Sequence, residues 1–162
     1  VRRTNKTKVR IPAGVDNGDN VRIRGEGCVG YNGGPSGDLV VEIRIKNHPI
    51  FTRRGLDVFC EVPITFTQAA LGAEIEVPTL DGKETLEIPE GTQTGRVFTL
   101  FGKGIPSINN PKRRGNQRIA VVVETPTHLS KEQKELLRRL EERMDETPKR
   151  KKFFDAIKDL FD

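Results

Sequence analysis

A repeated pattern of glycine and proline constrains the fold of this chain more than any other feature. Residues 11–27 read IPAGVDNGDNVRIRGEG, and residues 88–104 read IPEGTQTGRVFTLFGKG. The shared positions keep the same spacing: Ile11, Pro12, Gly14, Gly18, Gly25 and Gly27 recur as Ile88, Pro89, Gly91, Gly95, Gly102 and Gly104. Further along, GDLVVEIRIKNHP is echoed by GNQRIAVVVETPTHL. Because such glycines mark turns and close backbone approaches, the pattern predicts a duplicated β unit.

The same glycines also spell a nucleotide-binding signature that the surrounding sequence does not support. Gly25, Gly27 and Gly30 give G-x-G-x-x-G. A dinucleotide loop needs a helix directly after it, because the helix N-terminus holds the phosphate. The next segment, YNGGPSGD at 31–38, consists of turn formers. Gly30 is also not repeated in the second copy, where Ser107 stands, so we assign the glycines a structural role.

Alternating apolar residues predict short strands, and together they indicate a mainly β fold. The expected strands are 9–11, 21–23 and 39–45 in the first copy, 86–88, 97–101 and 119–123 in the second, and 58–62 and 73–77 between them. A short helix is expected at 67–71, and Asp81-Gly82 is a hairpin turn.

These elements predict two tandem β-sandwich-like units followed by C-terminal α-helices. Residues 1–51 form the second part of the first β unit, residues 52–129 form the second β unit, and residues 130–162 form the helices. The first unit has no counterpart of residues 56–84, so we expect its leading strands to lie upstream of residue 1. A β unit lacking these strands would be marginally stable by itself.

The C-terminal segment predicts two helices joined by a charged tether. Ser130 and Gln133 form a capping box for the first helix. DETPKRKK is expected to be a solvated tether, with an anion-binding patch as the alternative for its basic run. The second helix has an apolar stripe made by Phe153, Phe154, Ile157, Leu160 and Phe161. That stripe either docks on its own β unit or, as we favour, meets a second copy in a two-fold dimer.

Composition limits the chemistry that the chain can perform. Its net charge is +5 and its pI is about 9.4, which leaves a basic nucleic-acid-binding β module as an alternative function. Cys28 and Cys60 are far apart and His48 and His128 are the only histidines, so no catalytic constellation, disulfide framework or zinc site is predicted. No apolar run is long enough for a membrane span, and no signal peptide is apparent, so we expect a cytoplasmic protein that is not an enzyme.

Several characteristic segments together cover essentially the whole chain. They are KVRIPAGVDNGDNVRIRGEG, GDLVVEI, HPIF with RRG behind it, ALGAEIEVPTLDG, TQTG and KKFFDAIKDLFD. In this order they resemble one family, the C-terminal region of bacterial DnaJ co-chaperones. The resemblance implies a longer protein with a J domain, a Gly/Phe-rich linker, a zinc-binding module, two β-sandwich substrate domains and a dimerisation helix. The HPI at His48 is not the His-Pro-Asp signature of a J domain.

The resemblance also implies a function in protein folding and the heat-shock stress response. The chain would bind unfolded or misfolded polypeptides, and the parent protein would deliver them to DnaK, with GrpE, and stimulate the DnaK ATPase through its J domain. Thr7 and Val41 match the apolar substrate groove, although Thr7 is polar. The C-terminal helix would give a homodimer. No cofactor is expected in these residues, because zinc belongs to the upstream module, and membranes and nucleic acids are not expected partners.

Overall fold

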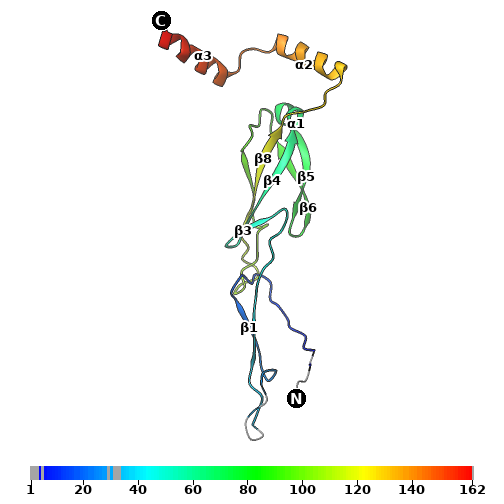
Figure 1. The fold of residues 1–162 in the computed structure, drawn as a ribbon, viewed down its shortest axis with the longest axis vertical. Helices are drawn as coiled ribbons and strands as arrows, with labels where there is room; N and C mark the ends of the chain where they lie inside the picture. The colour runs from blue at the N-terminus through cyan, green and yellow to red at the C-terminus, as the bar shows by residue number, and fades with distance from the viewer. Residues whose placement is uncertain (1–3, 5, 29, 31–33, 162) are drawn as a thin grey trace. The chain divides into compact units, whose positions relative to one another are not determined.

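The computed structural model describes residues 4, 6–28, 30 and 34–161, which form several small sheets followed by two helices (Figure 1). Contacts divide the chain into two compact units, Val1–Glu124 and Thr125–Asp162. The predicted fold class, mainly β with C-terminal helices, is confirmed. The boundaries that the sequence predicts after residues 51 and 129 stay predictions.

The first β copy is a two-stranded hairpin with little core of its own. Strands β1 (Asn20–Ile23) and β2 (Leu39–Glu42) pair antiparallel. Among the described residues before residue 52, Ile43 is the one buried side chain. The hydrophobic effect therefore contributes little to the described part of this copy.

The second β copy holds the hydrophobic core between two sheets. The larger sheet has the order β3 (Thr52–Arg54), β4 (Asp57–Thr65), β8 (Gln117–Glu124), β7 (Val97–Leu100), and Figure 1 shows β4 and β8 side by side, where they pair in parallel. The second copy also contains a second sheet and a short helix. The sheet is the antiparallel hairpin of β5 (Ala73–Thr79) and β6 (Gly82–Ile88), and the helix is α1 (Phe66–Leu71). The buried cluster comprises Cys60, Ile64, Ala69, Val77, Leu86, Ile88, Ile119 and Val121.

The duplication predicted from the sequence recurs in the backbone. Gly18 N donates to Ile43 O at 2.9 Å, and its counterpart Gly95 N donates to Val121 O at 2.8 Å. The three turn glycines of each copy have matching positive φ angles: 94°, 85° and 75° at Gly14, Gly18 and Gly25, against 74°, 87° and 71° at Gly91, Gly95 and Gly102. Only glycine adopts such angles readily, which explains why the sequence repeat is a glycine repeat.

Two strand predictions in the first copy were wrong, for one physical reason. Residues 9–11 form no strand, and the strand expected to reach residue 45 ends at Glu42. In the second copy the corresponding segments have partner strands. The counterpart of residues 9–11 lies in β6, which pairs with β5. The counterpart of residues 43–45 lies in the C-terminal half of β8, which pairs with β4. No described residue of the first copy supplies those partners. A short strand without a partner leaves its backbone groups unpaired.

The C-terminal unit contains the helices α2 (Lys131–Arg143) and α3 (Pro148–Phe161). The predicted capping box is confirmed, because Ser130 and Gln133 bond each other's backbone. The predicted tether was wrong in part: its basic run lies inside α3, whose first turn begins with Lys151 N donating to Thr147 O at 2.9 Å. Proline is favoured at the first helical position, and Lys and Arg are good helix formers.

Candidate functional site

Strand β2 presents an edge that its counterpart in the second copy does not. That counterpart, β8, pairs with β7 on one side and with β4 on the other. Within the described sheets, β2 pairs with β1 alone. The second edge of β2 is therefore unpaired among the described residues, at the place where the second copy has β4.

The two residues predicted to line a peptide groove lie on different segments. Val41 is half-buried in β2, opposite Val21 of β1. Thr7 is exposed in the segment before β1, and its hydroxyl donates to the Glu26 carboxylate at 3.4 Å. Val41 thus belongs to the strand with the open edge, whereas the described contact of Thr7 is polar. Their assignment to one groove stays a prediction.

A pocket of about 440 Å³ lies where the two β copies meet. Its apolar side chains come from both copies: Ile45, Phe51, Val58, Leu80 and Ile105. Pockets that bind ligands have volumes of roughly 300–1,000 Å³, so the space is large enough for an apolar side chain of a bound segment. We call it the junction pocket.

Arg53 forms hydrogen bonds that link the two β copies at the junction pocket. Its guanidinium donates to the carbonyl oxygens of Val15 at 2.6 Å, Gly14 at 3.1 Å and Gly55 at 2.8 Å. It also approaches the Asp16 carboxylate at 3.7 Å. The planar fork of an arginine suits several acceptors at once. In the sequence, RRG indicated only a family resemblance, and this role of Arg53 was not predicted.

His48 has a structural role in the turn before β3. Its Nδ1 accepts hydrogen bonds from the backbone N–H groups of Ile50 at 3.0 Å and Phe51 at 3.2 Å. Its ring also contacts the Phe51 ring, with the centroids 5.1 Å apart. The imidazole therefore caps the turn that leads into β3.

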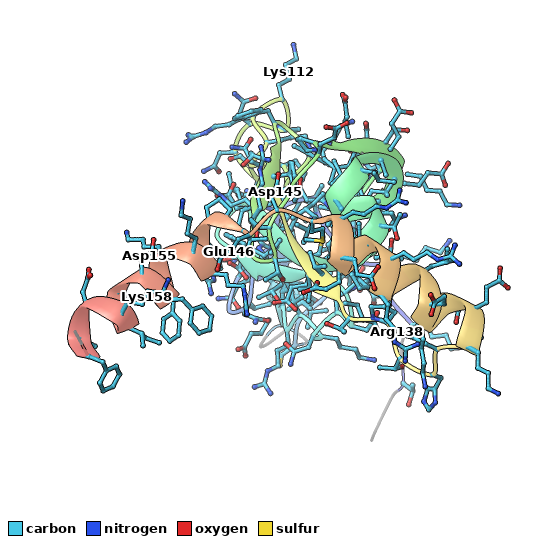
Figure 2. The ribbon with its side chains drawn as sticks, turned by 90° about the horizontal axis from the view of Figure 1, so that it is seen from above. Lys112, Arg138, Asp145, Glu146, Asp155 and Lys158 are labelled. Carbon is cyan, nitrogen blue, oxygen red and sulfur yellow. The ribbon has the colours of Figure 1, made fainter. Side chains whose placement is uncertain are left out.

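Helix α3 exposes the apolar stripe that the sequence identified. Phe153, Phe154, Leu160 and Phe161 are 59%, 40%, 77% and 84% exposed, and Ile157 is half-buried. Figure 2 labels Asp155 and Lys158, two exposed charged residues of the same helix. Leucines of α2 are also exposed, Leu136 by 57%. Exposed apolar patches are often interaction surfaces, and the assignment of this stripe to dimerisation stays a prediction.

The cysteines show no arrangement for nucleophilic or metal chemistry. Burial raises the pKa of the Cys60 thiol, and the hydrogen bond from Gln117 Nε2, at 3.6 Å, acts in the opposite direction. The side chain that Cys60 contacts in this bond is thus an amide and not a histidine. The described residues include no cluster of three or more His, Cys, Asp or Glu side chains that could hold a metal. No described helix is long and apolar enough to cross a membrane.

These features define a duplicated β module that exposes apolar surfaces and an apolar pocket. The family model described as DnaJ C terminal domain matches residues 1–126, and the chain belongs to this family. It is 60% identical over 161 residues, 98% of its length, to Chaperone protein DnaJ of Acetivibrio thermocellus. It is 56% identical over 163 residues, 99% of its length, to Chaperone protein DnaJ of Ruminiclostridium cellulolyticum.

The chain spans less than half the length of these relatives, 42% of one and 43% of the other. The match confirms the family that the sequence motifs indicated and the interpretation as the C-terminal region of a chaperone. The family model ends at residue 126, shortly before helix α2 begins.

Proposed function

We propose that this chain binds segments of non-native polypeptides as the client-holding part of a DnaJ co-chaperone. The observation that carries the proposal is the junction pocket, whose apolar lining residues come from both β copies. Backbone hydrogen bonds to the edge of β2 that no described strand pairs with would not depend on side-chain sequence, and the junction pocket adds a preference for large apolar side chains. Exposed apolar segments are typical of unfolded chains, so this combination selects non-native clients.

We further propose the role of the longer protein from its relatives, which are named as DnaJ chaperones. A J domain outside these residues would engage DnaK, with GrpE completing the cycle, and would stimulate the DnaK ATPase. Zinc would be held by a module upstream of the residues described, and the cytoplasmic location expected from the sequence belongs to this proposal. We expect the longer protein to bind clients more tightly than this chain does.

Self-association through α3 is the third part of the proposal. The exposed stripe of α3 places several large apolar side chains in water, and each gains roughly 1.5–3 kcal/mol when fully buried. A patch that meets itself across a two-fold axis is complete after two copies. Two client sites on one dimer also raise the effective concentration of the second site for a long unfolded chain.

The experiment that tests client binding blocks the β2 edge and leaves the hairpin intact. Ile43 N donates to Asp19 O across the hairpin at 2.8 Å. Because these bonds alternate along an antiparallel pair, the N–H of Val40 points to the open edge. Val40→Pro removes that donor, and proline is tolerated on an edge strand. Val40→Ala keeps the N–H and is the matched control.

Binding is measured by fluorescence anisotropy with an unfolded, leucine-rich peptide. We expect Val40→Pro to weaken binding about fivefold or more, since one peptide hydrogen bond is worth roughly 1 kcal/mol, and Val40→Ala to change it little. Tight binding that survives Val40→Pro would show that the site does not use the β2 edge.

A further inference from the structure

The turn before strand β1 contains a chemically reactive pair, Asn17 followed by Gly18. In such a pair the glycine nitrogen can attack the side-chain amide carbon of the asparagine, because glycine has no side chain to hinder the approach. Asn17 is exposed, and Gly18 has a φ angle of 85°, which only glycine adopts readily. The fold thus requires glycine after Asn17, and this makes Asn17 a candidate for deamidation.

In the folded chain, hydrogen bonds hold both reacting groups. Gly18 N donates to Ile43 O at 2.9 Å, and the side-chain oxygen of Asn17 accepts a hydrogen bond from Ile45 N. The attacking species is the deprotonated Gly18 nitrogen, and a hydrogen bond from this N–H to a carbonyl oxygen opposes loss of the proton. The bond from Ile45 also fixes the direction of the Asn17 amide. We therefore expect the reaction to require opening of the hairpin.

The second copy shows which part of this arrangement the fold requires. Gly95 N donates to Val121 O at 2.8 Å, and Val123 N donates to Thr94 Oγ1 at 3.1 Å. Thr94 thus occupies the place of Asn17 and also supplies an oxygen acceptor. Its hydroxyl group offers no carbonyl carbon for the neighbouring nitrogen to attack. The fold needs an acceptor at this place, and the reactive amide is particular to the first copy.

The hydrogen bonds around Asn17 belong to the copy with the smaller core. Ile43 is the one buried side chain among the described residues before residue 52, whereas the buried cluster lies entirely in the second copy. Segments with few buried apolar contacts open at a lower free energy than the rest of a structure. We therefore expect the first hairpin to open while the second copy remains folded.

We propose that Asn17 is a site of spontaneous deamidation that becomes reactive when the first hairpin opens. The Gly18 nitrogen loses its proton to solvent and attacks Asn17 Cγ. The bond from Cγ to the side-chain nitrogen breaks, ammonia leaves with a proton taken from solvent, and a cyclic succinimide joins the two residues. Water, the one co-reactant, then adds to either ring carbonyl group and opens the ring to aspartate or isoaspartate.

The two products differ in their effect on the turn. Aspartate keeps an oxygen that can accept from Ile45 N, but it places a further carboxylate beside Asp16 and Asp19. Isoaspartate carries the main chain through the former side-chain carbon and lengthens the backbone by a methylene group. The hydrogen bonds of Gly18 and Ile45 cannot both keep their present spacing in that product.

The junction pocket would change with the turn, since Asp16, Asn17 and Ile45 are among the residues that line it. Isoaspartate is therefore expected to deform one wall of the pocket. Any effect on client binding rests on the proposed function, whereas the deamidation itself does not.

The rate is measured by peptide-mapping mass spectrometry of the whole chain during incubation in mildly alkaline buffer, with aspartate and isoaspartate separated by chromatography. A synthetic peptide of residues 12–24 is the unfolded reference. We expect Asn17 to react about tenfold or more slowly in the chain than in the peptide, because only the open hairpin reacts. The sequence has another Asn-Gly pair at 32–33, outside the described residues, so the map follows the two pairs separately.

Two variants test the link to hairpin opening. Ile43→Ala removes the buried side chain of the hairpin and is expected to raise the rate at Asn17 about fivefold or more, toward that of the peptide. Ile11→Ala removes an apolar side chain of the same copy that is 56% exposed, and it should leave the rate unchanged. If Ile43→Ala unfolds the hairpin completely, the rate reaches the peptide value, so the expected direction is the same.

Asn17→Thr separates the reaction from the hydrogen bond, because it introduces the residue that the second copy has at Thr94. We expect no mass change at this position and unchanged amide hydrogen exchange at Ile45. The isoaspartyl form of the natural chain is expected to exchange at Ile45 about tenfold faster or more. Equal exchange in the isoaspartyl and unmodified chains would contradict the structural effect of the modification.

The outcomes separate this inference from the proposed function, since deamidation is measured without a client peptide. Equal rates at Asn17 in the chain and in the reference peptide, or in the natural chain and Ile43→Ala, would overturn the inference and leave the proposed function standing. If the rates differ as expected and no leucine-rich peptide binds the chain, the proposed function is wrong and the inference stands.

Discussion

Arg53 donates a hydrogen bond from Nη1 to the backbone carbonyl oxygen of Val15, at 2.6 Å, and so links strand β3 to the turn of the other β copy. Its side chain is 20% exposed. In the same turn, Gly14 has no room for a side chain, because an added Cβ would meet the Ile108 backbone nitrogen at 2.9 Å. The two copies are therefore joined by close backbone packing at Gly14 and by the hydrogen bonds of the Arg53 guanidinium.

We expect Arg53→Ala to loosen this junction. Hydrogen bonds from a charged donor contribute roughly 1.5–3 kcal/mol, so amide hydrogen exchange at Gly18 and Ile43 should accelerate about tenfold or more. Arg53→Lys should recover part of the protection, because an ammonium group cannot reproduce the fork. Arg54→Ala is the control, since the described contact of Arg54 is with the Phe59 ring. Equal exchange in the Arg53→Ala and Arg54→Ala variants would contradict the role of Arg53.

Gly115 and Gly37 occupy corresponding places in the two copies, yet we expect them to respond differently to alanine. A Cβ on Gly115 would collide with the Leu56 carbonyl group, whereas a Cβ on Gly37 would meet nothing within 4 Å. Overpacking of this kind costs roughly 1–3 kcal/mol. Urea unfolding should show that loss of free energy for Gly115→Ala and little change for Gly37→Ala. A harmless Gly115→Ala would mean that residues 56 and 115 are not packed as described.

The duplication could be predicted from the sequence because the repeat is fixed by local backbone geometry. A glycine with a positive φ is needed at Gly18 and again at Gly95, and the sequence records each requirement directly. The same holds for the capping box at Ser130. Thr65 and Gln68 form a second capping box, which starts α1 at Phe66, and this T-x-x-Q signal could have been found in the sequence.

Features that depend on distant partners could not be predicted in the same way. The parallel pairing of β4 with β8 joins Val58 to Gln117, and alternation alone does not state which strand a residue will pair with. The strand expected at 9–11 has the right pattern but no described partner. The contact between Arg53 and Val15 spans 38 positions in the sequence. Among the candidate binding surfaces, the apolar stripe of α3 could be predicted from the sequence, whereas the junction pocket could not.

The Cys60 thiol should make stability depend on pH in the alkaline range. Burial raises its pKa above the ordinary value of 9.0. Above that value the unfolded chain loses the proton while the folded chain keeps it, so the free energy of unfolding falls as the pH rises from the unfolded pKa to the folded one. Urea unfolding between about pH 8 and pH 10 should therefore show a steeper loss for the natural chain than for Cys60→Ala. Parallel curves for the two proteins would be inconsistent with a buried, protonated thiol.

Cys60 and Cys28 should also differ in their reactivity with a thiol reagent. Cys28 is exposed, whereas Cys60 is 5% exposed. Since the thiolate is the reactive form, we expect one thiol to react quickly in the native protein and the second only after unfolding. Spectroscopic titration before and after adding denaturant measures both. Rapid reaction of two thiols in the native state would show that the core around Cys60 opens easily.

The final prediction concerns the α3 stripe and its partner. Phe154→Ala with Leu160→Ala removes two of its large apolar side chains, which are 40% and 77% exposed in the single chain. If they are buried against a second copy, the loss of roughly 1.5–3 kcal/mol for each should shift the protein from dimer to monomer in sedimentation equilibrium, with little change in the β-sheet spectrum. Asp155→Ala with Lys158→Ala alters the same helix at two charged residues (Figure 2) and should leave the dimer intact. A natural chain that is monomeric at high concentration, or a Phe154/Leu160 variant that stays dimeric, would show that the stripe docks elsewhere.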